Sequence, residues 1–391
     1  MSPQAPNAVL ATISDEIARL GPIRFDRFME LALYGTGGFY DRPRIGSEPV
    51  ADFVTSPHVH PVFAQLVAEA IRGLHDAMGG PERFDLVEVG AGDGTLLRRL
   101  LPEIAELEPS VAAVERSPGA RRALAGIDGV TVHGSMFPSS APAIVLAHEL
   151  LDNLPFRRIR TTDDGPRDVF VGLERDRLVE VLEPVADPAD VGQLMAEPAG
   201  EAIVPVGGRS FVLEALAGPA PRALLAIDYG SDTGAGGPAH GYAEHRLVED
   251  LLLAPGDNDI TAGVDFGLLA AAVRSGGHLA FPTVTQSGAL VALGLEDWLL
   301  TELERQGDQL NTGRGAAAVG TWGGRSRAVL LADPAGLGRF RWFVAATAGV
   351  AEPAWLRRAR GVDRSPADDS SSAHRDPGSA LGDGPQPSSS R

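Results

Sequence analysis

The chain has 391 residues, of which 44% are hydrophobic, and it carries a formal net charge of −18. Its size suits one large or two moderate globular domains. It contains no cysteine and no lysine, which excludes disulfides, iron–sulfur clusters, thiolate zinc sites, a cysteine nucleophile, a Walker-type phosphate lysine and a Schiff-base lysine. The acidic charge disfavours nucleic acid and attracts basic proteins, although it could equally serve solubility alone.

No stretch of the sequence approaches the roughly 20 apolar residues of a membrane span. Residues 1–6 contain neither the basic region nor the apolar region of a secretion signal. We therefore expect a cytoplasmic protein without membrane insertion.

Residues 1–80 are expected to form an N-terminal helical and loop segment that caps the ligand site of the following domain. Ile13, Ile17 and Leu20 recur at helical spacing, and a second apolar stripe runs over 25–33. Pro61 is a favourable opening residue for a further helix, whose apolar face reaches Leu74.

The stretch from Phe84 to Leu97 reads as a strand, a tight turn and a helix, the first unit of a nucleotide-binding α/β sheet. A dinucleotide fingerprint needs its third glycine at position 95, where this chain has Thr95. The pattern Glu-x-Gly-x-Gly-x-Gly instead resembles the first motif of S-adenosylmethionine-dependent methyltransferases. The alternative is a generic glycine-rich turn. In the first reading, the cofactor-binding residues are Glu88, Gly90, Gly92 and Gly94.

Strand and helix patterns alternate from residue 84 onward, which is typical of a mostly parallel sheet. We expect a core over residues 81–350, with an antiparallel β-ribbon inserted at about 156–183 and a helical insertion at about 240–275. Strands are expected at 111–114, 130–133, 143–147, 224–227, 279–281 and 328–331, and helices at 247–253 and 266–273. Residues 363–391 are rich in Ser, Pro, Gly and Asp and are expected to be disordered.

Ligands of open α/β sheets bind outside the carboxyl ends of the strands. Glu115 ends the second core strand, 21 residues after Gly94, where a carboxylate can accept hydrogen bonds from ribose hydroxyls. The alternative is a solvated acid. After the third strand, Ser135 and Met136 are candidates to flank an adenine, with core packing an equal alternative for Met136.

The fourth core strand runs into His148, Glu149 and Asp152, three titratable side chains that are difficult to explain as core. Unpaired buried carboxylates are costly, so these residues must face a cleft, a partner or a cation. The zinc-protease pattern His-Glu-x-x-His is not met, because Asp152 occupies its last position. His58 and His60 are a weak metal candidate, and no metal site is predicted.

Three motifs in collinear order resemble the MidA family of methyltransferases: Asp52–Pro57, Val87–Leu96 and Ala147–Pro155. Shorter matches follow at 228–230, 255–256, 259–261 and 264–266, so the resemblance covers about residues 20–300. It implies an α/β, Rossmann-like, seven-stranded methyltransferase sheet with a helical addition, and it adds Thr55 and Ser56 to the expected cofactor-binding residues. The mitochondrial members of this family are associated with dimethylation of an arginine in a respiratory complex I subunit.

The chain departs from the family pattern at Ala51, where glycine is usual, and at His58, where glutamate is usual. Both positions lie in the segment expected to close over cofactor or substrate. The cofactor motif is intact, whereas the identity of the substrate is left open. His58 is therefore a candidate substrate contact.

The mechanistic hypothesis is that Glu149 and Asp152 clamp the guanidinium of an arginine-bearing protein, with His148 as proton acceptor. Asp228 and Tyr229, after the strand at 224–227, are further substrate candidates. The rivals are a small-molecule N- or O-methyltransferase, which needs a closed apolar pocket, and an assembly factor that binds cofactor without turnover. A dehydrogenase is disfavoured by Thr95. The sequence leaves monomer and homodimer open.

Overall fold

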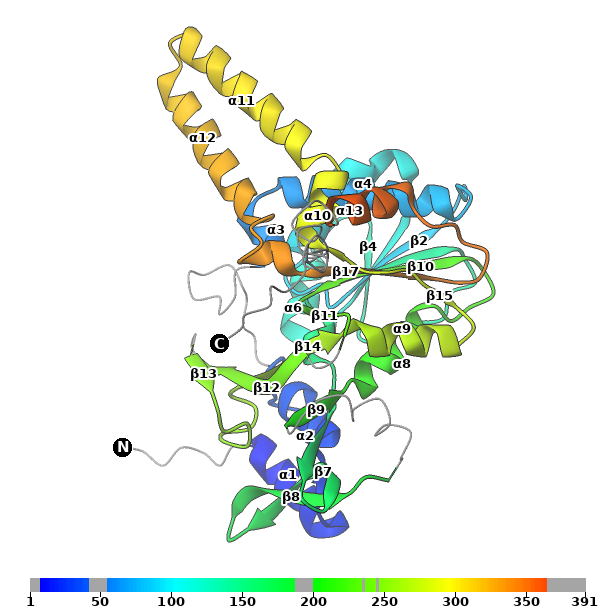
Figure 1. The fold of residues 1–391 in the computed structure, drawn as a ribbon, viewed down its shortest axis with the longest axis vertical. Coiled ribbons are helices and arrows are strands. Elements are labelled where there is room, and N and C mark those ends of the chain that lie inside the picture. The colour runs from blue at the N-terminus through cyan, green and yellow to red at the C-terminus, as the bar shows by residue number, and fades with distance from the viewer. Residues whose placement is uncertain (1–7, 42–54, 187–199, 234–235, 244–245, 364–391) are drawn as a thin grey trace, which may run out of the picture.

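The structure is a computed structural model that describes residues 8–41, 55–186, 200–233, 236–243 and 246–363 (Figure 1). Its centre is a mixed sheet with the strand order β15–β17–β10–β5–β2–β3–β4. The five strands from β10 to β4 are parallel, and β17 is antiparallel to β10. Their bounds are β2 (Asp85–Val89), β3 (Ser110–Val114), β4 (Val130–His133), β5 (Ala143–His148), β10 (Arg222–Asp228), β15 (Leu279–Ala280) and β17 (Arg341–Ala346). The expected seven-stranded Rossmann-like sheet is confirmed, and β16 (Val284–Thr285) adds a short pairing to β17.

Helices cover both faces of this sheet (Figure 1). One apolar cluster joins α4, α5, α10 and α13 to alternate strand residues, and a second joins α8 and α9 to the residues between them. This division follows from the strand period of two, which sends successive side chains to opposite faces. The bounds are α4 (Val62–Ala77), α5 (Thr95–Leu100), η1 (Leu101–Leu107), α6 (Pro118–Leu124), α8 (Val206–Ala215), α9 (Phe266–Ser275), α10 (Gln286–Ala292), η3 (Leu337–Arg339) and α13 (Ala354–Asp363).

The first helices pack against the inserted strands rather than against the central sheet. Helices α1 (Ala8–Leu20) and α2 (Phe25–Tyr34) share an apolar cluster with β7 and β9, and β1 (Ile23–Arg24) pairs with β7. The expected antiparallel ribbon is present as β6 (Arg157–Thr162), β7 (Gly165–Glu174) and β8 (Arg177–Pro184), with β9 (Glu201–Val204) beside β6. The boundaries at residues 80 and 350 stay predictions.

The insertion expected to be helical at 240–275 consists of strands and turns up to Asp265, so that prediction was wrong over its first part. Strands β11 (Gly230–Ser231), β12 (Gly236–Ala243), β13 (Arg246–Val248) and β14 (Asp259–Asp265) form a small sheet, and helix begins only at Phe266. The helix expected at 247–253 is absent because β13 pairs with β12 and a turn follows it. Of its four leucines only Leu251 is buried, so no apolar helical face forms.

Helices α11 (Leu295–Asn311) and α12 (Gly315–Leu330) form a hairpin that projects from the body (Figure 1). The strand expected at 328–331 is instead the end of α12, because an apolar run of four residues fits either structure. The last strand of the central sheet in chain order is β17, which lies between β15 and β10 and which the sequence pattern did not reveal. Its core residues Trp342 to Ala346 are buried.

The tail expected to be disordered lies outside the described residues, apart from Asp363. Asp363 ends α13, and its carboxylate accepts hydrogen bonds from the backbone N and Oγ1 of Thr285. Within the described ranges, no helix combines the length and apolar character needed to cross a bilayer.

Candidate active site

The glycine turn connects β2 to α5 with three residues in the left-handed region. The φ angles of Gly90, Gly92 and Gly94 are 71°, 54° and 78°, values that favour glycine over residues with a Cβ. A Cβ on Gly94 would lie 2.7 Å from Ile127 Cδ1, whereas a Cβ on Gly92 would meet nothing within 4 Å. Gly94 therefore serves packing, and Gly92 leaves open space in which a ligand can approach the backbone.

Two acids lie next to this turn. The carboxylate of Glu115 accepts hydrogen bonds from Gly92 N at 3.0 Å and Ser117 N at 2.8 Å, so it is fixed against the turn. Glu88, at the end of β2, is only 3% exposed and its Oε2 has no hydrogen-bond partner. Burial, with the negative charges of Asp93 and Glu115, raises the pKa of Glu88 to about 8. Both acids lie where the cofactor was predicted.

Helix α3 (Ser56–Val59) lies beside the turn. His58 Nδ1 is 2.8 Å from Thr55 Oγ1, and its Nε2 is 3.4 Å from Asp93 Oδ2, so His58 reaches the cofactor turn rather than the acids after β5. The Ser56 side chain is buried and its hydroxyl oxygen accepts a hydrogen bond from Gln286, so it ties α3 to α10, and a cofactor contact of Thr55 or Ser56 stays a prediction. Ala51 and Asp52–Val54 lie outside the described residues.

His148 and Glu149 follow one another at the carboxyl end of β5. Glu149 adopts a left-handed φ of 51°, which is unusual for a non-glycine residue, and this turns its side chain back toward His148. His148 Nε2 and Glu149 Oε1 are 3.3 Å apart. Burial lowers the pKa of His148 to about 3, and burial with Asp152 raises the pKa of Glu149 to about 8.

These two pKa shifts correct the expected role of His148 as proton acceptor. At neutral pH the proton is carried by Glu149 and the imidazole of His148 is neutral, because the buried imidazole is the weaker base here. Glu149 is therefore the better candidate to receive a proton from a substrate.

Asp152 lies in η2 (Leu151–Asn153), directly after this pair. Its Oδ2 accepts a hydrogen bond of 2.8 Å from Thr261 Oγ1, and Tyr229 Oη is 2.8 Å from the same hydroxyl. Burial raises the pKa of Asp152 to about 6, and its Oδ1 has no hydrogen-bond partner. Tyr229 thus lies in the predicted substrate region and is linked to Asp152 through Thr261.

Asp228 was expected to contact substrate, and the structure gives it a different role. It is fully buried, and its Oδ2 accepts the backbone N–H of Leu151 at 2.7 Å and that of Asp152 at 3.4 Å. Its Oδ1 accepts the N–H of Tyr229. Asp228 therefore positions the loop that carries Asp152 and does not face a ligand.

A second group of polar side chains, which sequence reasoning did not assign, closes the far side of η2. Asp259 Oδ1 accepts hydrogen bonds of 3.0 Å from both Tyr40 Oη and Asn153 Nδ2. The Tyr34 hydroxyl donates to the Asn153 carbonyl, and the Arg116 guanidinium lies 4.2 Å above the Tyr34 ring. The sequence contained a signal for this polar group, because Asp259 and Thr261 lie two residues apart in one of the shorter matches to the family pattern.

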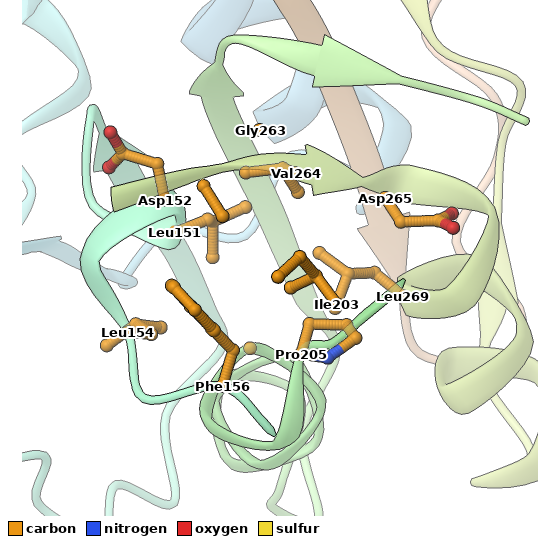
Figure 2. A pocket seen from close by; sticks show the side chains of 12 residues that line it. Leu151, Asp152, Leu154, Phe156, Ile203, Pro205, Gly263, Val264, Asp265 and Leu269 are labelled. Carbon is orange, nitrogen blue, oxygen red and sulfur yellow. The ribbon is translucent and has the colours of Figure 1, made fainter. Parts of the chain in front are cut away.

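Apolar side chains pack against one side of η2 (Figure 2). Side chains from β9, α8, β14 and α9 surround a cavity of about 10 Å³, including Ile203, Pro205, Val264 and Leu269. Figure 2 shows the Asp152 carboxylate directed away from this apolar group. The cavity has room for about one water molecule, so it is no site for an organic methyl acceptor.

Ser135 and Met136 follow β4 as expected. Ser135 is exposed, and Met136 is half-buried against the apolar cluster that contains Val114 and Val145. His133 and Phe137 stack with ring centroids 4.1 Å apart. Contact between these residues and an adenine stays a prediction.

The acids of this region lack cationic partners. Among the described residues, no arginine forms an ion pair with Glu88, Glu149, Asp152 or Asp259, and His148 is neutral. Burial raises the pKa of Asp259 to about 7, in line with the other three acids. Carboxyl groups buried together without counter-ions are stabilised when a cationic ligand binds. The arrangement therefore favours the binding of a cationic ligand.

Replacing Thr261 with valine removes the hydroxyl between Asp152 and Tyr229 while keeping the shape of the side chain. We expect the turnover rate to fall about tenfold, since Asp152 loses the hydrogen bond that orients it, which is worth about 1–2 kcal/mol. Cofactor affinity should change less than twofold. Steady-state kinetics with calorimetric cofactor binding measures both, and Tyr229→Phe, which leaves the Thr261–Asp152 bond intact, should lose less activity than T261V.

Comparison with known proteins identifies the family to which the chain belongs. The sequence profile of a family of S-adenosyl-L-methionine-dependent methyltransferases matches residues 66–283, more than half of the chain. The mitochondrial protein arginine methyltransferase NDUFAF7 of Rattus norvegicus is 28% identical over 333 residues, 75% of this chain and 76% of that protein. The Bos taurus protein of the same name is 30% identical over 300 residues, 65% and 66% of the two chains.

A crystal structure from Burkholderia thailandensis with bound S-adenosyl-homocysteine has a TM-score of 0.75 and 23% identity, covering 90% of this chain and 96% of that one. The fold, the glycine turn and the acidic strand ends define an S-adenosylmethionine-dependent methyltransferase. The chain belongs to the methyltransferase family whose profile it matches, and its resemblance to MidA proteins is confirmed.

The residues present fit S-adenosylmethionine as the cofactor. The unpartnered Glu88 carboxylate suits a cationic group, the open side of Gly92 allows close approach to the backbone, and Glu115 is held where it can meet ribose hydroxyls. The individual roles of these residues stay predictions.

Proposed function

We propose that this methyltransferase modifies an arginine side chain of a protein, with Glu149 and Asp152 holding the guanidinium. The observation that carries the proposal is a pair of acids at the end of β5 with raised pKa values and no cationic partner. The names of the relatives as protein arginine methyltransferases support the same acceptor.

The two acids act by orientation and by accepting a proton. A protonated guanidinium is a poor nucleophile, and carboxylates that accept its N–H groups fix one nitrogen in the direction of attack. When bound, S-adenosylmethionine supplies a methyl group on a positively charged sulfur. Methylation removes one proton from the acceptor nitrogen, and the Glu149 carboxylate can take it because its pKa is about 8.

The other candidates have less support. A small-molecule methyltransferase needs a closed apolar pocket, and the apolar cavity beside Asp152 measures about 10 Å³. An assembly factor without turnover would not need Glu149 in a left-handed conformation beside a second acid that lacks a cationic partner. The cytoplasmic location expected from the sequence stays a prediction.

The rate should depend on pH with a definite sign. Both acids must be ionised to hold a guanidinium, and their pKa values in the free enzyme are about 8 and about 6. We therefore expect kcat/KM to rise with pH, about tenfold per pH unit between 6 and 8, and more steeply below 6. A kcat/KM profile from pH 5.5 to 9.5 measures this, and a profile that falls with pH over that range would contradict the clamp.

The proposal is tested by transfer of a radiolabelled methyl group from S-adenosylmethionine into an extract of the cells that make this protein. We expect label in the acid-precipitable protein fraction, and none when Glu149→Gln replaces the wild type. Label confined to small molecules would overturn the protein acceptor.

A further inference from the structure

The α11–α12 hairpin and the start of α4 enclose a cleft that the methylation reaction does not use. Its volume is about 500 Å³, which is within the range of sites for metabolite-sized ligands. The body of the protein contributes His60, Pro61, Val62 and Gln65. None of the lining residues belongs to the glycine turn or to the acids after β5, so the cleft is a separate place on the molecule. The polar residues on the hairpin side are Trp298, Glu302, Arg305, Gln309, Thr321 and Arg327.

Gln309 is the most deeply buried polar residue of the hairpin wall. It is 6% exposed, and its Oε1 accepts a hydrogen bond of 2.9 Å from Thr321 Oγ1, which fixes the plane of the amide. Its Nε2 has no hydrogen-bond partner among the described residues, yet this atom is not fully enclosed. The amide N–H groups are therefore accessible from the cleft that Gln309 lines. A donor at this burial is costly to leave unpaired, so it favours an acceptor in the cleft.

His60 presents a second donor from the opposite wall. Its Nδ1 accepts the backbone N–H of Val62 at 3.1 Å, so the proton of the neutral ring lies on Nε2. Burial, with the positive charges of Arg327 and Arg99, lowers the pKa of His60, and the ring is neutral at pH 7. A Cβ built on Gly324 of α12 would lie 3.4 Å from His60 Nε2, so this N–H is directed across the cleft toward the hairpin.

Arg327 gives the cleft its positive charge. Within the described ranges, its guanidinium forms neither an ion pair nor a hydrogen bond. The other arginine of the lining, Arg305, pairs with Glu302 at 2.9 Å, so those two charges compensate each other. One uncompensated cation therefore remains in the cleft of a chain whose net charge is −18. A guanidinium is a planar fork of donors that matches a carboxylate or a phosphate.

The acceptors of the lining are mostly engaged already. The Glu302 carboxylate is bonded to Arg305, and the Thr321 hydroxyl is bonded to Gln309. The indole N–H of Trp298 adds another donor, and its ring holds His60 edge-on with centroids 5.0 Å apart. The cleft thus combines one unpaired cation with several unpaired donors. This is the opposite of the acidic site after β5, and it favours an anionic ligand.

We propose that this cleft binds a small anion that presents a phosphate or carboxylate group to Arg327, His60 and Gln309. Arg327 supplies the charge and a forked contact, and the Nε2 atoms of His60 and Gln309 donate the remaining hydrogen bonds. The size of the cleft suits a molecule of metabolite size rather than a folded partner. The inference goes beyond the proposed function and does not depend on the identity of the methyl acceptor.

The first test is calorimetric titration of the full chain with inorganic phosphate, pyrophosphate and citrate, at constant ionic strength in a buffer that contains no phosphate. We expect one anion to bind per chain. Tighter binding of pyrophosphate identifies a phosphate ligand, and tighter binding of citrate identifies a carboxylate ligand. Arg327→Gln should weaken binding at least about tenfold, because charge-assisted hydrogen bonds are lost. Gln309→Glu keeps the Thr321 bond but adds a negative charge, so it should abolish binding.

Arg357→Gln is the matched control. Arg357 is an exposed arginine on α13 and does not line the cleft, so this variant removes the same charge from a different place. It should bind the anion as the wild type does. Unchanged circular dichroism and an unchanged melting temperature show that each variant is folded.

A second measurement uses tryptophan fluorescence to locate the bound anion. Of the four tryptophans in the chain, Trp298 lines the cleft, whereas Trp342 and Trp355 are buried in the core. The fourth, Trp322, is exposed and is not part of the lining. The anion that binds in calorimetry should change the emission of the wild type, and Trp298→Phe should remove this change. A change that persists in W298F would overturn the proposal, because the anion would then bind elsewhere.

Three further outcomes would also overturn it. The first is that none of the three anions binds at millimolar concentrations. The second is equal affinity of the wild type and R327Q, which would mean an adventitious ion only. The third is displacement of the anion by saturating S-adenosylmethionine, because the anion would then occupy the cofactor site. We expect the anion and the cofactor to bind at the same time.

Discussion

Glu149→Gln should lower the turnover rate by about 10²–10³-fold while changing S-adenosylmethionine affinity less than threefold. The variant keeps the size and backbone of the residue but removes the charge that holds a guanidinium and the base that takes its proton. Asp152→Asn should lose less, because Thr261 still orients the amide oxygen. Single-turnover methyl transfer with the labelled protein fraction measures the rate, and calorimetry measures the cofactor affinity.

Glu82→Gln is a matched control, because Glu82 is exposed and lies in the loop before β2. It should behave as the wild type in both measurements. Undiminished turnover by Glu149→Gln with the native acceptor would remove Glu149 from the chemistry, whatever its effect on cofactor binding.

Glu88→Gln should have opposite effects on stability and on cofactor binding. The folded protein raises the pKa of Glu88 from 4.5 to about 8, so the unfolded chain ionises this group first as pH rises. Stability contributed by the protonated acid is complete below pH 4.5 and is lost as pH rises toward 8, by up to about 4 kcal/mol. A neutral amide avoids this loss. The apoprotein variant should therefore melt several degrees above the wild type at pH 8 and close to it at pH 4.5.

Cofactor binding should weaken at least tenfold in the same variant, because the unpartnered carboxylate is lost from the cofactor turn. Thermal melts of the apoprotein at the two pH values and calorimetric titration with S-adenosylmethionine measure the two effects. If the variant and the wild type melt at the same temperature at pH 8, Glu88 does not destabilise the apoprotein. If their affinities for S-adenosylmethionine are equal, Glu88 does not bind the cofactor.

Local signals in the sequence predicted the sheet and the cofactor turn. The glycines at 90, 92 and 94 have positive φ values, which no other residue type adopts as easily, so their spacing in the sequence predicts the turn. An acid lies at or next to the carboxyl end of β2, β3 and β5, and the parallel register brings Glu88, Glu115 and Glu149 to one edge. These features depend on neighbours in the chain.

The features that sequence reasoning missed depend on distant contacts. From the sequence, Asp228 resembles an acid that contacts substrate. In the structure its carboxylate instead accepts hydrogen bonds from N–H groups that lie 76–77 residues away in the chain. Arg246–Val248 is a strand only because β12 pairs with it, and Ala328–Leu331 is a helix end only because α12 packs on α11. The low pKa of His148 likewise comes from burial, which a three-residue motif does not express.

The central claim is that the acids after β5 hold an arginine guanidinium for methylation. Its most direct test is to purify the protein that takes up label from radioactive S-adenosylmethionine, hydrolyse it completely and separate the labelled amino acids. We predict that the label migrates with methylated arginine and that Glu149→Gln abolishes it. Label recovered instead in methylated lysine, histidine or a carboxyl ester would contradict the guanidinium clamp.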